Sequence, residues 1–200
     1  MHKLLVATQN RHKLEEYRDL LYDIGDIEWL CLTDIGLEHL HVEESGTTFQ
    51  ENARLKAEAY GESSGLMTLA DDSGLVVPSL NGEPGVYSAR YGGPSIQTDA
   101  QRYQLLLQNL ADKSDRTAYF VCVIALYVPY QGVQFFEGRV DGYIAFAPRG
   151  TNGFGYDPVF ELPNGRTMAE LSPNEKHELS HRGRAVQLLL PELKYILSNN

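Results

Sequence analysis

Two long β-rich segments in the middle of the chain constrain its fold more than any other feature. Residues 118–128 and 133–146 are rich in Val, Ile, Phe and Tyr, and the sequence Pro-Tyr-Gln-Gly joins them. This arrangement predicts a long antiparallel hairpin. Helix-like and strand-like segments lie on both sides of the hairpin along the chain, so the fold class is α/β or α+β.

The other elements follow from hydrophobic periodicity and turn residues. Short apolar runs predict strands at residues 3–8, 27–32, 66–70, 75–77 and 158–160. The segment Asp71-Asp72-Ser73-Gly74 separates the strand at 66–70 from the strand at 75–77. Helices are expected at residues 13–21, from Thr48 to Tyr60, and at 96–110 and 181–197. Because no repeat, low-complexity tract or linker occurs, residues 1–200 are expected to form a single domain.

The charge of the chain narrows the classes of partner. The net charge of −10 argues against a nucleic-acid binder, because phosphate backbones attract basic faces. Residues 1–72 contain 15 Asp and Glu but only 6 Lys and Arg. This excess indicates either a solvated surface or carboxylates gathered around a divalent cation.

The compartment follows from the apolar runs and the cysteines. No run approaches the ~20 residues of a membrane span, and the first ten residues lack the apolar core of a secretory signal. Cys31 and Cys122 are isolated from each other and lie in apolar sequence, so we interpret both as reduced core cysteines. These features predict a soluble, cytoplasmic protein.

The segment TQNRHK, residues 8–13, links the first predicted strand to the first predicted helix. Backbone N–H groups at a helix N-terminus suit a phosphate, and Thr8, Asn10 and Lys13 add polar and positive side chains. The alternative is a helix cap followed by a solvated lysine. The chain contains neither a Walker loop nor a GxGxxG fingerprint.

Two acidic pairs, Glu43-Glu44 and Asp71-Asp72, are candidates for a metal site. Mg²⁺ is typically held by one or two carboxylates together with substrate phosphate oxygens and water. The second pair follows an apolar run, and α/β proteins usually place ligands at strand ends. The alternative is an Asp-Ser-Gly turn that closes a hairpin.

Two further polar segments have both a functional and a structural interpretation. Asn52 and Lys56 are one helical turn apart and share a face, which is also typical of a solvated polar face. In the loop 153–158, glycines flank Phe154, so the backbone could approach a flat ligand while the ring stacks on it. A tight loop with a core phenylalanine is the alternative.

Lys176, His181 and Arg182 lie within seven residues of one another near the start of the last predicted helix. Their side chains can donate to a phosphate or to the carbonyl oxygens of a base. Positive residues at a helix N-terminus oppose the helix dipole, which favours a function over simple surface charge. Together, the candidate segments supply the groups that a Mg²⁺-dependent nucleotide hydrolase needs.

In the order and spacing of these segments, the chain resembles the Ham1-type inosine triphosphate pyrophosphatases, which act on non-canonical purine nucleoside triphosphates. The resemblance extends from Leu4 to about Leu190, and its most specific parts are LADDSGL, GFGYDP and SHRG. The motifs are TQNRHK (8–13), EESGTTFQENARLKA (43–57), LADDSGL (69–75), PGVYSARY (84–91), GTNGFGYDPVF (150–160) and ELSPNEKHELSHRGRA (170–185).

The resemblance implies an α/β fold with an elongated mixed sheet, flanking helices and two lobes around a central nucleotide cleft, in a homodimer. It implies hydrolysis of ITP, dITP and XTP to the monophosphate and pyrophosphate with Mg²⁺, or with Mn²⁺ in its place. Asp72 then matches the proton acceptor and, with Glu43, a metal ligand. The implied substrate-binding residues are Thr8, Asn10, Lys13, Lys56, Ser73, Phe154, Gly155, Tyr156, Asp157, Lys176, His181 and Arg182.

One residue departs from the family pattern, and two other functions remain to be compared. The family turn is usually Thr-Gly-Asn, and we expect the side chain of Gln9 to narrow or re-aim it. A catalytically silent nucleotide sensor would lack the metal carboxylates, but Glu43 and Asp72 are present. A related pyrophosphatase for modified pyrimidine or methylated nucleotides would lack the FGYD and SHR segments, and both are present.

Overall fold

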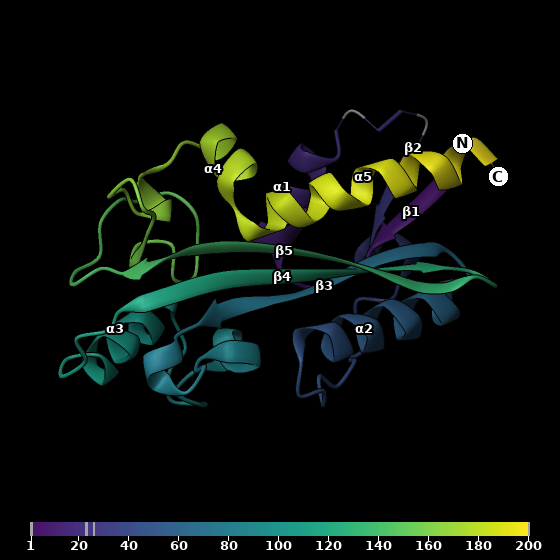
Figure 1. Cartoon of the computed structure of the whole chain (residues 1–200). Helices are drawn as coiled ribbons and strands as arrows, with labels where there is room; N and C mark the ends of the chain where they lie inside the picture. Colours follow the sequence, from purple (N-terminus) through teal and green to yellow (C-terminus); the bar gives the residue numbers. More distant parts are fainter. Residues whose placement is uncertain (1, 23, 26, 200) are drawn as a thin grey trace. The chain divides into compact units, whose positions relative to one another are not determined.

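The chain forms a mixed sheet flanked by helices. The structure, a computed structural model, describes residues 2–22, 24–25 and 27–199 (Figure 1). In this part of the chain the strands form a six-stranded sheet in the order β2-β1-β3-β4-β5-β6. Strand β1 (His2–Val6) runs parallel to β2 (Ile27–Cys31) and to β3 (Met67–Val76). The predicted α/β class is confirmed.

The central hairpin is also confirmed. Strands β4 (Thr117–Val128) and β5 (Gly132–Ile144) are neighbours in the sheet, and only residues 129–131 connect them. A connection this short joins antiparallel strands, since parallel strands need a crossover of a dozen or more residues. The short strand β6 (Phe160–Glu161) then pairs with β5 in antiparallel orientation.

Strand β3 corrects one expectation. It runs without interruption from Met67 to Val76, so the predicted break and the Asp-Ser-Gly turn at residues 71–74 are wrong. Asp and Gly are poor strand formers, but strand propensity yields readily to tertiary contacts. Here Asp71 and Asp72 are buried and have polar partners, so the strand continues through them.

Contacts within the chain divide it into two compact units. The first comprises Met1–Asp72, Cys122–Gly138 and Arg182–Asn200. The second comprises Ser73–Val121 and Arg139–His181. Each unit has its own hydrophobic cluster of buried side chains.

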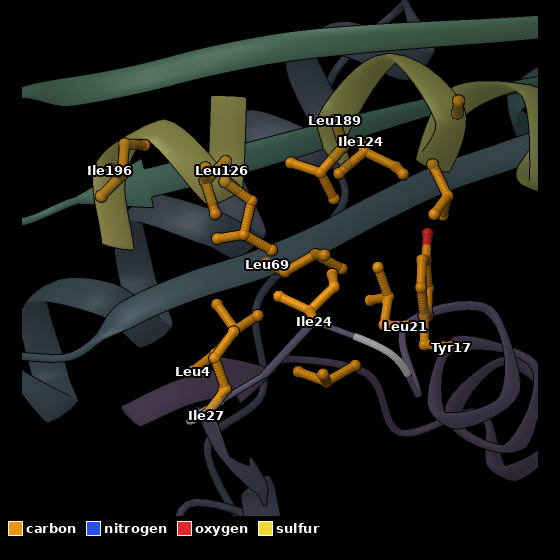
Figure 2. Packing of buried hydrophobic residues seen from close by; sticks show 14 of the residues in the cluster. Leu4, Tyr17, Leu21, Ile24, Ile27, Leu69, Ile124, Leu126, Leu189 and Ile196 are labelled. Carbon is orange, nitrogen blue, oxygen red and sulfur yellow. The ribbon is translucent and has the colours of Figure 1, made fainter. Parts of the chain in front are cut away.

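In the first unit, helices cover both faces of the strands (Figure 1). Helices α1 (Arg11–Leu20) and α5 (His181–Asn199) lie on one face, and α2 (Phe49–Ser64) lies on the other. The hydrophobic cluster of the first unit, which we call the main cluster, packs side chains of the strands against α1 and α5 (Figure 2). The helix predicted at residues 181–197 is confirmed, and its buried side chains include Val186, Leu189, Leu193 and Ile196.

The opposite face of the same strands packs closely on α2. Ala53 and Ala57 are fully buried there. A Cβ atom at Gly61 would overlap the ring of Tyr127 on β4. Side chains alternate along a strand, so Leu126 faces the main cluster while its neighbour Tyr127 faces α2. This close approach fixes the helix that carries Asn52 and Lys56.

The second unit contains α3 (Asp99–Asn109) and α4 (Pro173–Leu179). Helix α3 begins after Thr98, later than the predicted start at residue 96. Helix α4 was not predicted, although Ser172 and Glu175 form a capping box around a proline at the first helical position. The 3₁₀ helices of the described chain are η1 (Leu32–Ile35), η2 (Pro78–Leu80), η3 (Gly85–Arg90) and η4 (Met168–Glu170).

The two cysteines differ in their surroundings. Cys122 is fully buried, as predicted, and both thiols are free. The interpretation of Cys31 as a core cysteine is wrong, because its half-exposed Sγ contacts the hydroxyl of Thr33 at 3.0 Å and a carboxylate oxygen of Asp34 at 2.9 Å. Within the described residues, no helix is both long and apolar enough for a membrane crossing.

Candidate active site

The turn between β1 and α1 is held by its own side chains. Asn10 is the N-cap of α1, and its Oδ1 accepts from the backbone N–H groups of His12 and Lys13 at 3.0 and 3.3 Å. The hydroxyl of Thr8 accepts from the backbone N–H of Asn10 at 3.1 Å. Gln9 Nε2 donates to the carbonyl oxygen of Glu38 at 3.2 Å, so the side chain is held by a segment outside the turn.

Lys13 extends from this turn to a buried carboxylate on β3. Its Nζ donates to Asp71 Oδ2 at 2.8 Å, and Arg182 Nη2 donates to the same oxygen at 3.3 Å. Arg182 is only 1% exposed, and its Nη1 donates to Glu16. Burial alone would raise the pKa of Asp71, but the nearby positive charges hold it well below its usual value. Asp71 is therefore a permanent anion between two cations.

A second charged cluster surrounds the next residue of the strand. Lys56 Nζ lies 2.6 Å from Glu44 Oε1 and 3.7 Å from Asp72 Oδ1. Burial raises the pKa of Asp72 above its usual value, and the opposing charge of Lys56 does not fully offset that effect. Asp72 is thus a more basic carboxylate than Asp71, although the two are neighbours in sequence.

Asn52 connects this cluster to the loop before α2. Its Oδ1 accepts from the backbone N–H of Gly46 at 2.8 Å, while its Nδ2 donates to Asp72 Oδ2 at 3.1 Å. Only one orientation of the amide satisfies both bonds, so the carboxylate of Asp72 always faces a donor. Asn52 is fully buried, and the interpretation of Asn52 and Lys56 as a solvated polar face is wrong.

The carboxylates fit a divalent cation that substrate helps to hold. Among the described residues, no three His, Cys, Asp or Glu side chains form a ready-made metal site. Mg²⁺ needs only one or two carboxylates when phosphate oxygens and water complete its ligands. Asp72 is buried and under-compensated, so a nearby cation would stabilise its ionised form. Glu43 is exposed, and its neighbour Glu44 contacts Lys56.

In the second unit, the glycine loop is organised around Asp157. Its Oδ2 accepts from the backbone N–H of Phe154 at 2.9 Å and from Lys176 Nζ at 2.7 Å. Lys176 Nζ also lies 4.7 Å from the centre of the Phe154 ring. A Cβ at Gly153 would overlap the Asp157 carboxylate, which explains the glycine at that position. The half-buried Phe154 is therefore held beside a cation and is not a core residue.

Other predicted residues of the second unit occupy defined places. The buried Tyr156 donates its hydroxyl to the carbonyl oxygen of Ser88 at 2.9 Å. The ring of His181 stacks on Phe120, with centroids 4.7 Å apart. Ser73 follows Asp72 on β3 and is half-buried.

The structure thus brings the predicted residues together in two groups. The first unit contains Thr8, Asn10, Lys13, Glu43, Lys56, Asp72 and Arg182. The remaining predicted residues belong to the second unit. Arg182 is paired with carboxylates of the first unit, so its predicted role in reading a base stays a prediction. Sequence reasoning missed Glu16, although it lies three residues after Lys13 and hence near it on the helix.

Comparison with known proteins gives consistent results over nearly the whole chain. The model of the family described as Ham1 matches residues 4–192. A dITP/XTP pyrophosphatase of Staphylococcus epidermidis is 45% identical over 193 residues, covering 94% of this chain and 95% of that protein. One of Gloeobacter violaceus is 48% identical over 191 residues, covering 95% and 93%.

Solved structures agree with these relatives. The Ham1 protein of Staphylococcus aureus has a TM-score of 0.87 to this chain, with 40% identity and coverage of 97% of this chain and 99% of that one. The HAM1 protein of Coxiella burnetii also has a TM-score of 0.87, with 44% identity and full coverage of both chains.

Proposed function

Since this chain belongs to the Ham1 family, we propose that it hydrolyses non-canonical purine nucleoside triphosphates to the monophosphate and pyrophosphate, and so cleanses the nucleotide pool. ITP, dITP and XTP are the preferred substrates, and Mg²⁺ is the metal, with Mn²⁺ able to replace it. The observation that carries this proposal is the buried cluster on β3, where two adjacent carboxylates of different basicity face two lysines.

The lysines supply the charge that a triphosphate needs. Substrate carries about four negative charges at neutral pH, while residues 1–72 are strongly acidic. Lys13 and Lys56 therefore bind phosphate oxygens, with Thr8 and Asn10 orienting the turn from which Lys13 extends. Both lysines are held by carboxylates in the free protein, so they are positioned before substrate arrives.

Asp72 is the proton acceptor. Water attacks the α-phosphorus, a new P–O bond forms, and the bond to the pyrophosphate oxygen breaks, while the proton of the water passes to an Asp72 carboxylate oxygen. Asn52 fixes the orientation of this carboxylate, because its Nδ2 donates to Asp72 Oδ2 at 3.1 Å. Asp71 cannot serve equally well, because its two cationic partners lower its basicity.

Glu43 and Asp72 are the residues that would hold the metal ion. When bound, a divalent cation supplies neutralisation of the phosphate charge and of the leaving pyrophosphate. Glu44 and Asp71 lie 2.6 and 2.8 Å from lysine Nζ atoms, closer than the 3.7 Å between Lys56 and Asp72, so their contribution to metal binding is secondary.

The second unit supplies base recognition. Phe154 stacks on the purine, and Lys176 donates to the 6-oxo group. An adenine amino group in that place would leave donor facing donor, a mismatch that gives large discrimination. His181 completes the base contacts of this unit, and Ser73, Gly155, Tyr156 and Asp157 line the ribose and base region. Arg182, which lies in the first unit, is proposed as a further substrate-binding residue.

We further infer that the chain works as a single domain, as a homodimer and in the cytoplasm. Sedimentation equilibrium at micromolar concentration tests the dimer, with the expected mass twice that of the 22.4 kDa chain. A monomer at every concentration would contradict it.

A pyrophosphate assay over a panel of triphosphates tests the proposed function. We expect kcat/KM for ITP, dITP and XTP to exceed that for GTP, and GTP to equal or exceed ATP, with no turnover in excess chelator. Release of single orthophosphates would contradict the mechanism. Tight ITP binding without turnover would indicate a nucleotide sensor, and turnover restricted to modified pyrimidine or methylated nucleotides would indicate a related pyrophosphatase.

Asp72→Asn separates chemistry from binding. The amide keeps the shape of the side chain but cannot accept the proton, so turnover should fall by at least the ~10²–10⁴-fold typical of a lost general base. ITP binding, measured by calorimetry, should change much less. Exposed Asp112→Asn is the matched control, and an active Asp72→Asn enzyme would move the proton acceptor elsewhere.

A further inference from the structure

The glycine loop of the second unit is tied to α3 by a residue that lies outside all the motifs described above. The backbone N–H of Gly155 donates to Asp99 Oδ2 at 2.7 Å. The other oxygen, Asp99 Oδ1, accepts from Arg102 Nη1 at 2.7 Å. One carboxylate therefore links the loop to a charged side chain on the first turn of the helix.

Asp99 is not needed to begin that helix. Thr98 is the N-cap, and its hydroxyl accepts from the backbone N–H of Gln101 at 3.2 Å. Gln101 Oε1 in turn accepts from the backbone N–H groups of Gln97 and Thr98 at 2.9 and 3.0 Å. These bonds satisfy the helix end, so the carboxylate of Asp99 is directed to the loop instead.

With the bond to Asp99, three successive residues of the loop, 154–156, each donate a hydrogen bond. Asp157 holds the Phe154 N–H, Asp99 holds the Gly155 N–H, and Ser88 accepts from the Tyr156 hydroxyl. Asp157 lies within the loop and moves with it, whereas Asp99 is on a regular helix. Gly155 has a φ of +63°, and a Cβ there would meet nothing within 4 Å. The glycine thus serves the backbone conformation that aims this N–H at Asp99.

We propose that Asp99 is a positioning residue that sets the orientation of the base-recognition loop. By fixing the Gly155 N–H, it fixes the peptide plane that follows Phe154, and hence the direction from which the ring meets a purine. This role requires no contact of Asp99 with substrate or metal. This inference rests on the proposed function for its kinetic consequence, but the bond itself can be observed without any activity.

Two substitutions and one control test the proposal. Asp99→Ala removes the acceptor, while Asp99→Asn keeps an oxygen for Gly155 and replaces the other by an amide that faces the donor groups of Arg102. Arg102→Gln removes the ion pair and leaves the carboxylate. If the ion pair with Arg102 were the important feature, Arg102→Gln and Asp99→Ala would have equal effects. Because exposed or half-exposed ion pairs usually contribute little, we expect Arg102→Gln to have the smaller effect.

The first measurement is hydrogen exchange at the Gly155 amide, followed by NMR. We expect strong protection in the wild-type protein and in Arg102→Gln, and at least tenfold faster exchange in Asp99→Ala. Unchanged exchange in Asp99→Ala would overturn the tether, whatever the enzyme does.

The second measurement is steady-state kinetics with ITP and ATP. A lost charge-assisted hydrogen bond corresponds to about a tenfold change or more. We therefore expect Asp99→Ala to raise KM for ITP about tenfold and to lower the ITP-to-ATP ratio of kcat/KM. Its kcat should stay within about threefold, and product inhibition by pyrophosphate should not change. Asp99→Asn should lie between Asp99→Ala and the wild type.

These outcomes separate the inference from the function on which it rests. A wild-type protein that does not turn over ITP would refute the proposed function alone, and the exchange data would still report on the tether. Fast exchange at Gly155 with an unchanged KM and base ratio would overturn the positioning role. Equal losses in kcat for ITP and ATP would also overturn it, because a general defect in folding has that signature. If Asp99→Ala does not fold, Asp99→Asn supplies both readouts.

Discussion

Asp71→Asn should destabilise the protein strongly, because it removes the anion that lies between two buried cations. Asp71 is 3% exposed, and the side chains of Lys13 and Arg182 are 14% and 2% exposed. Removing one partner of a buried ion pair typically costs ~3–5 kcal/mol. Lys13 can partly rehydrate and the amide oxygen still accepts a hydrogen bond, so we expect the lower end, about 3 kcal/mol.

Urea denaturation at neutral pH measures this loss. With a slope of ~2 kcal/mol per molar urea, 3 kcal/mol moves the midpoint down by about 1.5 M. The double variant Asp71→Asn/Lys13→Met tests the cause, since it also removes one of the uncompensated cations. We expect it to recover at least ~1 kcal/mol relative to Asp71→Asn, within the usual range of coupling between contacting residues. A midpoint within 0.3 M (about 0.6 kcal/mol) of wild type, or strictly additive effects of the two substitutions, would refute the reasoning.

Three further predictions concern other parts of the structure. Gly61→Ala places a methyl group against the ring of Tyr127. The cost of overpacking, ~1–3 kcal/mol, should exceed the ~1 kcal/mol gained in helix propensity, so we expect a lower Tm in thermal denaturation. A higher Tm would contradict this account of the packing. Burial raises the pKa of the Cys122 thiol to about 12, so a disulfide reagent at neutral pH should leave this thiol unmodified until urea is added. Hydrogen bonds from Arg166 and from a backbone amide lower the pKa of Glu175 to about 2 in the folded protein. The ionised carboxylate therefore stabilises the fold above the unfolded-state pKa near 4.5, and this stabilisation is lost as pH falls toward 2. A Glu175 carboxyl chemical shift that titrates near 4.5 would contradict the lowered pKa.

Local sequence rules were sufficient for much of the fold. The hairpin of β4 and β5 was predictable because two long β-rich runs flank the short turn Pro-Tyr-Gln-Gly, and α2 was predictable from Thr48 and Glu51, which form a capping box. The error at Asp71 arose because turn chemistry was read locally. The partners that keep a strand there, Lys13 and Arg182, are 58 and 111 residues away in sequence.

The candidate site was predictable in composition but not in its pairings. The motifs named Lys13, Lys56 and Asp72, but nothing in the sequence indicated that Asp71 and Asp72 have opposite pKa shifts. Such differences depend on which charges lie within a few ångströms, which is a property of the folded chain. The bond between Asp99 and Gly155 spans 56 residues and follows no local pattern, so it could be found only from the structure.

The division of the chain into discontinuous segments has a consequence for the order of events during synthesis. Every segment of the second unit has left the peptidyl transferase centre once residue 181 has been added. The first unit begins the chain, yet its core needs Val186, Leu189 and Leu193 from the last helix. On the ribosome, β1 to β3 and their acidic cluster are therefore made long before that helix. A chain that stops after residue 181 contains every segment of the second unit but lacks Arg182, one of the two cations that donate to Asp71.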